Sequence, residues 1–269
     1  MPEERSSLRA DCARCVGLCC VAPAFEASAD FAFDKPAGRR CPNLLADFRC
    51  GIHDDLGPRG FHGCAVFDCQ GAGQKVTQVT FGGRDWRSAP ELAGEMFNAF
   101  AIMRQLHELL WYLTEALTLP AARSLRGDLA GALEETERLT RLDPDALMLV
   151  DVRAHREGVK ALLLRASELV RAGLGPGRAE LPGADLVGRS FRGADLCGAN
   201  LRGAYLLGAD LRAANLSHAD LTGADLRAAD LRKANLATSI FVTQFQVNTA
   251  KGDAATRLPR ALTRPPHWR

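Results

Sequence analysis

A five-residue rhythm runs through the last third of the sequence without an insertion. Fourteen consecutive units, from AELPG and ADLVG to SIFVT and QFQVN, occupy residues 179–248. The centre of nearly every unit is Leu or Phe, and the residue two positions before it is small. A period of five does not match the 3.6 residues of a helical turn, and each glycine would cost a helix about 1 kcal/mol. The repeat therefore argues against a helix and predicts a solenoid.

This pattern closely resembles the pentapeptide-repeat family, whose fold is a right-handed quadrilateral β-helix. In that fold five residues form one side of a coil, and successive coils stack at roughly 4.8 Å. The Asp or Asn before each central residue is expected at a corner, bonded to local backbone, with Gly easing the turn. The central residues are expected to point inward: Leu186, Phe191, Leu196, Leu201, Leu206, Leu211, Leu216, Leu221, Leu226, Leu231, Leu236 and Phe241.

The far end of such a stack needs a cover, because open β backbone invites aggregation. The segment TQFQVNTAKGD is expected to be helical and to cover the last coil, and Trp268 in the tail to pack against it. Residues 249–269 are therefore interpreted as a C-terminal cap and tail.

The charges of the solenoid limit what it can do. Residues 179–248 contain seven acidic and seven basic side chains, which cancel. Some relatives in the family mimic DNA and protect gyrase, but such mimicry needs a stripe of net negative charge. A rigid protein-interaction scaffold is therefore the favoured role, and a DNA-mimic topoisomerase-protection protein is an alternative.

Eight of the nine cysteines lie near the N-terminus: Cys12, Cys15, Cys19, Cys20, Cys41, Cys50, Cys64 and Cys69. The first residues are polar and show no export signal, so we expect a cytoplasmic protein, where stable disulfides are rare. Clustered cysteines in such a protein therefore indicate metal ligands more strongly than disulfide bonds, although disulfides or free thiols remain alternatives. Eight thiolates fit two four-cysteine sites of zinc or iron–sulfur. The side chains of the adjacent Cys19 and Cys20 are expected to point in different directions. They therefore suit two separate metal sites or one larger metal cluster better than a single tetrahedral ion.

The order of these cysteines resembles the zinc- or iron-chelating domain family of the YkgJ type. The family pattern begins with CxxC and CC, continues with CPxL and CxIY, and ends in a cysteine pair. The chain has CPNL at residues 41–44 and CGIH at 50–53, and GPR at 57–59 replaces an Arg-Pro. The resemblance covers roughly residues 10–70 and implies bound zinc, iron or an iron–sulfur cluster at the eight cysteines.

Two histidines flank the later cysteines. His53 stands where the family usually has Tyr, and His62 precedes Cys64. Either could be a ligand, but a loop histidine is more often solvated or placed behind the ligands. All the ligands are expected in one compact region, because about 60 residues cannot bury two separate cores.

The whole chain is predicted to be multidomain. Residues 1–87 form the cysteine-rich metal-binding module, which includes a short strand over 75–81. Residues 88–175 form a helical bridge, with helix starts at Pro90, Pro120 and Asp143-Pro144, a possible break at Gly158 and a stop at Gly173. Trp111 and Tyr112 are expected in the core of that region, with a partner or dimer face as the alternative.

No nucleophile elbow, P-loop, dinucleotide fingerprint or HExxH motif is present. The leading hypothesis is a non-catalytic bacterial metal-binding protein whose solenoid or helical region binds a protein partner. An iron–sulfur-dependent enzyme or redox protein is the alternative. The net charge is only +2 and no long apolar run occurs, so we expect neither direct nucleic-acid binding nor a membrane span.

Overall fold

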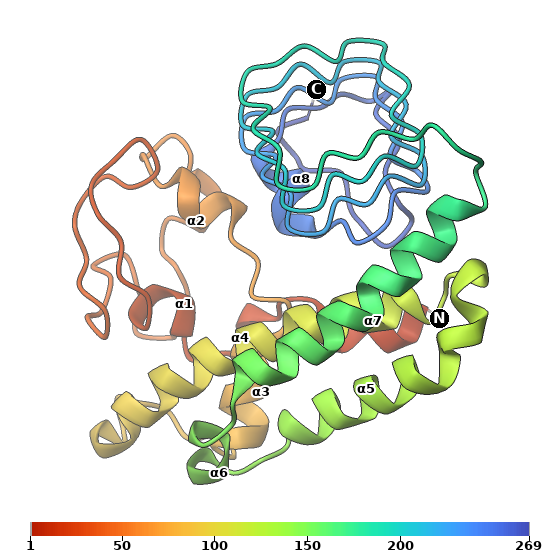
Figure 1. Cartoon of the computed structure of the whole chain (residues 1–269). Helices are drawn as coiled ribbons and strands as arrows, with labels where there is room; N and C mark the ends of the chain where they lie inside the picture. The colour runs from red at the N-terminus through yellow and green to blue at the C-terminus, as the bar shows by residue number, and fades with distance from the viewer. Residues whose placement is uncertain (1, 269) are drawn as a thin grey trace. The chain divides into compact units, whose positions relative to one another are not determined.

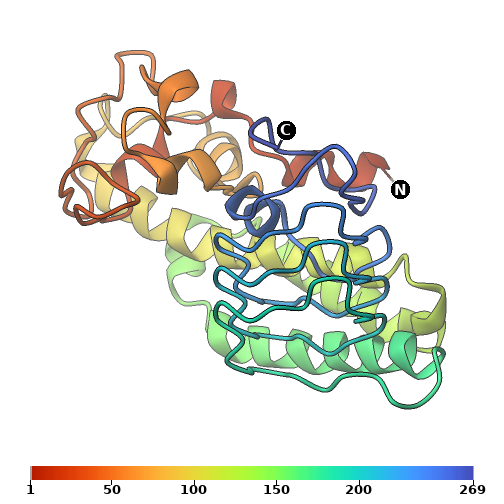
Figure 2. The same cartoon turned by 90° about the horizontal axis from the view of Figure 1, so that it is seen from above.

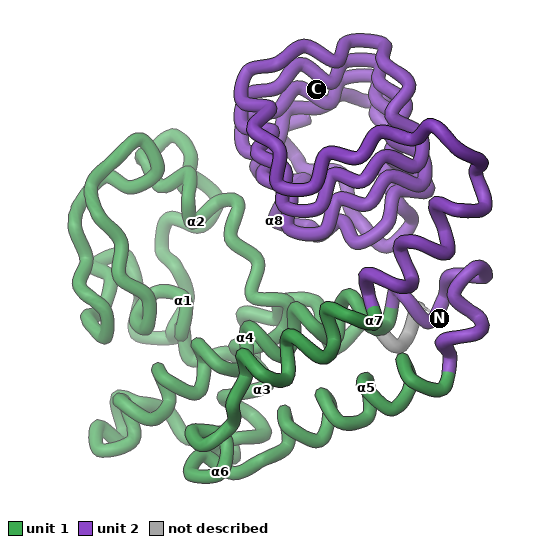
Figure 3. The backbone as a smooth tube through the Cα atoms, viewed as in Figure 1, with its two compact units in different colours: residues 1–114, 127–162 green, residues 115–126, 163–269 purple. Residues whose placement is uncertain are grey.

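The structure is a computed structural model that describes residues 2–268, with side chains from residue 5 onward. It divides into two compact units, coloured separately in Figure 3. Unit 1 comprises residues 1–114 and 127–162, and unit 2 comprises residues 115–126 and 163–269. The helical region between the cysteines and the repeats is thus shared by the two units.

Short helices and long loops make up the first part of unit 1, and longer helices follow (Figure 1). The short elements are η1 (Pro2–Leu8), η2 (Cys12–Arg14), α1 (Leu18–Val21), η3 (His53–Asp55), α2 (His62–Val66), α3 (Ala72–Lys75), the π-helical η4 (Val76–Thr80) and η5 (Pro90–Leu92). The later elements are α4 (Ala93–Ala116), η6 (Pro120–Leu125), α5 (Arg126–Leu139), α6 (Pro144–Met148) and α7 (Val152–Ala172).

The strand predicted over residues 75–81 is wrong, because this segment is helical. Helix α3 continues directly into η4, and the Thr77 hydroxyl donates to the carbonyl oxygen of Gly73 at 2.9 Å. Val76, Thr77 and Phe81 are all buried, whereas Val79 is exposed. That spacing suits a helical face and not the alternation of a strand, so packing overrides the β-branched composition.

The core of unit 1 forms around α4, as its apolar spacing predicts. Met96, Phe100, Met103 and Leu106 are each at most 2% exposed. They lie in one cluster with buried residues of other elements: Leu18, Val21, Val76, Phe81 and Leu147. Each such side chain contributes about 1.5–3 kcal/mol by leaving water. Trp111 and Tyr112 are also buried, so the core interpretation of both is confirmed.

Most predicted helix boundaries are confirmed. Pro90 opens η5, Pro120 opens η6, and the Asp143 side chain caps α6 by accepting from the backbone N–H of Ala146. Helix α7 ends at Ala172, directly before Gly173. The break suggested at Gly158 is wrong, since α7 runs through it. The interruption lies at residues 149–151, where the Asp151 carboxylate accepts from the N–H of Ala154 at 2.9 Å and caps α7.

The repeats of unit 2 form the predicted coil. Figure 1 looks along its axis, where the chain traces a four-sided ring, and Figure 2 shows the coils stacked from the side. Parallel bridges join residues twenty apart, as in the series Asn200, Asp220 and Ile240. Leu201, Leu206, Leu211, Leu216, Leu221, Leu226, Leu231 and Leu236 are at most 1% exposed, so their inward placement is confirmed. Phe191, in the first coil, is only partly buried because a coil covers it on one side alone.

The last predicted unit, QFQVN, is not a β side of the coil. Helix α8 (Gln244–Thr249) takes its place, and the stack resumes where Lys251 pairs with Asp230 and Arg257 with Asn235. The central residue of the unit QFQVN is Gln246, and burying its polar side chain without hydrogen bonds inside an apolar coil would be unfavourable. Its Nε2 instead donates to the carbonyl oxygens of Leu221 and Ala224, at 2.8 and 2.9 Å.

The expected cover is confirmed in part, because only Gln244–Thr249 of the predicted helical segment is helical and residues 251 and 257 continue the stack. A capping box joins Thr243 and Gln246 at the start of α8. Trp268 is 6% exposed, and its Nε1 donates to the carbonyl oxygen of Ala250 at 2.9 Å. The tail therefore closes the end of the stack that would otherwise present unpaired backbone.

Candidate functional site

The eight N-terminal cysteines all lie in unit 1, on short elements and the loops between them. Cys12 opens η2 and Cys15 ends it, and Cys19 and Cys20 are neighbours on α1. Cys41 and Cys50 lie on the loop before η3, Cys64 lies on α2, and Cys69 precedes α3. None of them is in a disulfide.

Cys15 and Cys69 both lie beside Gly73 of α3. A Cβ atom on Gly73 would lie 2.7 Å from the Cys15 sulfur and 3.8 Å from the Cys69 sulfur. Both thiols and that of Cys19 pack against the same hydrophobic cluster of unit 1. The pKa of the Cys15 thiol is raised to about 12, mainly by burial, and the charges of Cys19 and Cys69 act in the same direction. The pKa of Cys12 is raised by burial and then by the same two neighbours.

Backbone pairing brings Cys41 and Cys50 to Cys20. The N–H of Cys41 donates to the carbonyl oxygen of Cys20 at 3.0 Å. Cys50 forms a bridge with Leu44, whose N–H donates to the carbonyl oxygen of Cys41 at 3.1 Å. Burial raises the pKa of Cys64 to about 11, and the charges of Cys19, Cys41 and Cys50 raise it too.

Backbone N–H groups point at several of these sulfurs. Hydrogen bonds from Gly71 and Gly73 act to lower the pKa of Cys69, and one from Leu18 acts in the same direction on Cys15. Burial outweighs them, so both pKa values stay above the ordinary range. Without a bound ion these thiols are therefore protonated at neutral pH, and a metal must displace their protons.

A buried lysine stands beside the cysteines. Lys35 is 3% exposed, and its Nζ donates to four backbone carbonyl oxygens, those of Val21, Pro23, Pro36 and Arg39. Burial lowers the pKa of Lys35, and the charges of Cys41, Cys20, Cys64 and Cys19 act in the opposite direction. Lys35 thus places an amino group, held by four carbonyl oxygens, beside the thiols. Nothing in FAFDKPAG marks this lysine as buried, so the sequence alone does not predict its role.

The thiols do not form a ready-made metal site. Across residues 2–268, no three or more His, Cys, Asp or Glu side chains are arranged so that they could hold an ion as they stand. The donors nevertheless have the required chemistry: eight thiols in one region, N–H groups directed at sulfur, and a nearby cation. Coordination at about 2.3 Å requires the cysteine side chains to turn toward a common centre.

The two histidine candidates lie on short helices of unit 1. His53 opens η3 and His62 opens α2, and both side chains are exposed. The His62 ring faces Gly57, where an added Cβ would lie 3.7 Å from its Nδ1.

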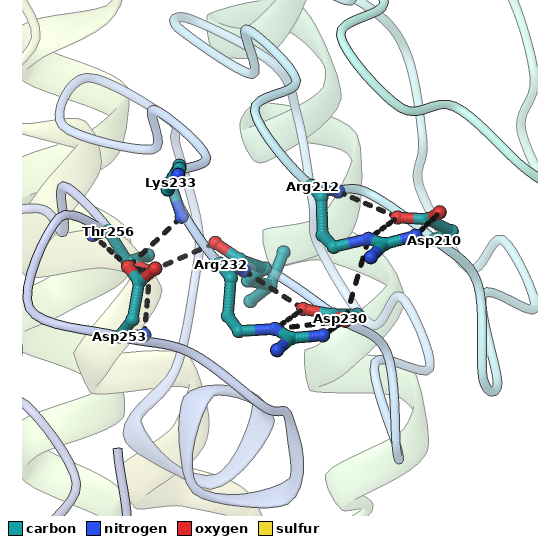
Figure 4. Close-up of polar contacts among 8 residues, drawn as sticks. Asp210, Arg212, Asp230, Arg232, Lys233, Asp253 and Thr256 are labelled. Atoms are coloured by element: carbon teal, nitrogen blue, oxygen red, sulfur yellow. Dashed lines mark hydrogen bonds and ion pairs between the residues drawn. The ribbon is translucent and has the colours of Figure 1, made fainter. Parts of the chain in front are cut away.

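Asp210, Asp220, Asp225 and Asp230 of the solenoid are paired with arginines of the coils. Arg212 binds Asp210 through Nε at 2.8 Å and through a terminal nitrogen at 2.6 Å, and Arg232 binds Asp230 in the same way (Figure 4). The Arg212 hydrogen bond lowers the pKa of Asp210 to about 2. Arg227 pairs with Asp225 and Arg202 with Asp220. The negative charge of each of these carboxylates is balanced by a neighbouring arginine. The coil therefore lacks the continuous net negative charge of a DNA phosphate backbone.

One side of the solenoid carries exposed apolar side chains. Tyr205 is 55% exposed and Leu207 38% exposed within one repeat unit. Val187, 51% exposed, occupies the same position as Leu207 in the preceding coil.

No helix within residues 2–268 is long and apolar enough to cross a membrane.

The family model of pentapeptide repeats matches this chain in eight copies, over residues 179–217 and 209–241. Among solved structures, a pentapeptide-repeat protein from Nostoc is 29% identical, covering 36% of this chain and 89% of its own, with a TM-score of 0.25. A pentapeptide-repeat protein of the Arabidopsis thaliana thylakoid lumen is 30% identical, covering 34% of this chain and 63% of its own, with a TM-score of 0.17.

Similarity over nearly the whole length links the chain to a bacterial protein. It is 57% identical over 267 residues to the uncharacterized protein YybG of Bacillus subtilis (strain 168), covering 97% of this chain and 95% of YybG. The chain therefore belongs to the same family as YybG, and its C-terminal part is a pentapeptide-repeat solenoid.

Proposed function

We propose that this protein binds a thiophilic metal, zinc or iron, through its eight N-terminal cysteines and uses its solenoid as a rigid surface for a protein partner. The gathering of Cys12, Cys15, Cys19, Cys20, Cys41, Cys50, Cys64 and Cys69 into one region of unit 1 carries the metal part of the proposal. Residues far apart in sequence converge there without forming a disulfide.

Metal would also supply folding energy to a part of unit 1 that has few regular elements. Between α1 and α2 the described backbone forms only η3 and isolated bridges. A structural ion contributes on the order of 10 kcal/mol to such a fold. Its loss should therefore loosen residues 10–70 and leave the solenoid intact, since the coils bury their own leucines.

Limited proteolysis of the full chain with and without a strong chelator tests this proposal. Removal of metal should open residues 10–70 to the protease, and readdition of Zn²⁺ should restore protection. Residues 200–240 serve as the internal control and should stay protected throughout. Equal protection of residues 10–70 in both conditions would count against a metal role.

The partner part of the proposal rests on the exposed apolar side chains. Tyr205, Leu207 and Val187 offer an apolar surface on a rigid frame, whereas the neighbouring charges are satisfied within the coil. Crosslinking in cells, compared between the native chain and Leu207→Lys, tests it. A partner crosslinked to the native chain and lost from the variant supports a docking role, and identical crosslinks contradict it.

An iron–sulfur redox protein or enzyme is the second candidate. N–H groups directed at Cys15 and Cys69, and the Lys35 cation, are features that tune the potential of a cluster. The colour of anaerobically purified protein separates the two, since a cluster is brown and a zinc site is colourless.

A further inference from the structure

The turn that follows Cys69 has an unusual backbone conformation. Gln70 and Gly71 both lie in the left-handed region, with φ angles of 49° and 82°. Glycine enters this region freely, whereas a residue with a Cβ atom is strained there. Such strain persists only where surrounding contacts hold the backbone in place, so the contacts of Gln70 show what fixes the turn.

Both backbone polar groups of Gln70 are held. Its N–H donates to Oδ1 of Asp68 at 2.8 Å, and its carbonyl oxygen lies 2.7 Å from Nδ1 of His107 on α4. Because a carbonyl oxygen can only accept, Nδ1 carries the proton and donates it. His107 is 3% exposed, and its pKa is lowered to about 4, mainly by burial, so the imidazole is neutral at pH 7.

The same turn directs backbone donors at the Cys69 thiol. Hydrogen bonds from the N–H groups of Gly71 and Gly73 reach this sulfur. Hydrogen bonds of this kind favour the thiolate, which is the form that binds a metal. The turn is also tightly packed, since a Cβ atom on Gly71 would clash with the carbonyl oxygen of Ser7. The conformation of Gln70 and Gly71 therefore decides how Cys69 and its donors are presented.

We propose that His107 is a positioning residue for metal binding: its hydrogen bond to Gln70 fixes the turn that presents the Cys69 thiol and its N–H donors. The inference rests on the proposed metal binding and deepens it, because it names a side chain behind the cysteines on which metal affinity depends. His107 acts through Gln70 and is not assigned as a ligand.

Two substitutions of His107 in the full chain separate its hydrogen bond from its bulk. Leu fills the buried space but cannot donate, whereas Asn carries an amide nitrogen that can replace Nδ1 as the donor. Affinity for Zn²⁺ is measured without oxygen by competition with a chelator. It should fall about 10–100-fold in His107→Leu and stay near the native value in His107→Asn. His155→Leu is the matched control, because His155 bonds to Thr136 and should not affect the affinity.

A second background tests the turn itself. Gln70→Gly removes the strain, because glycine adopts a positive φ without cost. In a Gln70→Gly chain, His107→Leu should therefore lower the Zn²⁺ affinity by a smaller factor than in the native chain. Amide hydrogen exchange of the metal-free chain gives a readout independent of zinc. His107→Leu should speed exchange at Gly71 and Gly73 and leave the amides of α7 unchanged.

Three results would overturn the role of His107. They are equal losses of affinity in His107→Leu and His107→Asn, an equal loss from His107→Leu with and without Gln70→Gly, and unchanged exchange at Gly71 and Gly73. Zinc bound equally well by the native chain and by His107→Leu would refute the positioning role alone. A native chain that binds no Zn²⁺ would refute the proposed metal binding and the positioning role with it.

Discussion

The backbone N–H of Cys41 hydrogen-bonds to the carbonyl oxygen of Cys20 at 3.0 Å, and this contact ties the two halves of the cysteine region together. Sequence spacing groups Cys20 with Cys12, Cys15 and Cys19, whereas this contact places it with the later cysteines. The Lys35 ammonium lies against the backbone on both sides of the contact, through the carbonyls of Val21 and Arg39. The side chain of Lys35 therefore holds together the two backbone segments that carry Cys20 and Cys41.

Lys35→Met should weaken metal binding. A four-thiolate zinc site carries net negative charge, and Lys35 is a buried basic side chain beside the cysteine segments. Loss of a supporting residue behind the ligands typically costs 10–100-fold in metal affinity, and roughly that loss is expected here. Chelator titration followed by native mass spectrometry measures it. Lys75→Met is the control, since Arg141 and Glu137 are the charges that act on Lys75; equal losses in both variants would contradict the role of Lys35.

Gly73→Ala should weaken metal binding through Cys15 and Cys69. In a helix, Ala is ordinarily favoured over Gly by about 1 kcal/mol. Here the new methyl group would lie 2.7 Å from the Cys15 sulfur and would push it away from Cys69. Gly158→Ala on α7 is the matched control, because open space surrounds that position. It should leave metal affinity unchanged and stabilise its helix, and a Gly73→Ala chain with native zinc affinity would show that Gly73 does not hold the two sulfurs together.

Gly208→Ala and Ala228→Gly should change stability in opposite directions. The two residues occupy the same corner in successive coils, with φ angles of 65° and 57°. Nothing lies within 4 Å of a Cβ on Gly208, so only the backbone angle matters there. A left-handed conformation costs a residue with a Cβ about 1 kcal/mol, so Gly208→Ala should lose and Ala228→Gly gain about that much. Hydrogen exchange of residues 200–240 measures both effects, and changes of the same sign would contradict the argument.

Asp210→Asn should remove part of the acid sensitivity of the solenoid. Arg212 lowers the pKa of Asp210 to about 2, against an ordinary value of 3.8. A lowered pKa stabilises the fold above the ordinary value, and that stability is lost as the pH falls toward the folded value. Asn occupies the equivalent corner at Asn200, Asn215 and Asn235, so the substitution keeps the turn. The variant should melt below the native chain at pH 6 and together with it at pH 2, whereas a constant gap would refute the pairing.

The solenoid could be predicted from the sequence because its cause is local. Every fifth residue occupies an equivalent environment, so a leucine at the centre of a unit is enough to predict that this position is buried inside the coil. Two central positions differ from the prediction. Residue 246 is a glutamine that lies in helix α8 and donates to backbone carbonyl oxygens, and Phe191 is only partly buried because its coil is covered on one side.

The cysteine region could be predicted only in part. Residue type and spacing indicate thiolate chemistry, but which thiols meet depends on the Leu44 bridge, the Cys20 carbonyl and the absence of a side chain at Gly73. These are tertiary relationships that no spacing rule contains. The same holds for residues 75–81, where packing of Val76, Thr77 and Phe81 replaces an apparent strand with a helix.

Elemental analysis of full-length protein purified without oxygen tests the central claim most directly. The account predicts zinc or iron bound to the native chain. A chain in which the eight N-terminal cysteines are replaced by serine, and Cys197 is kept, should contain none. Equal and negligible metal in both chains would contradict the account.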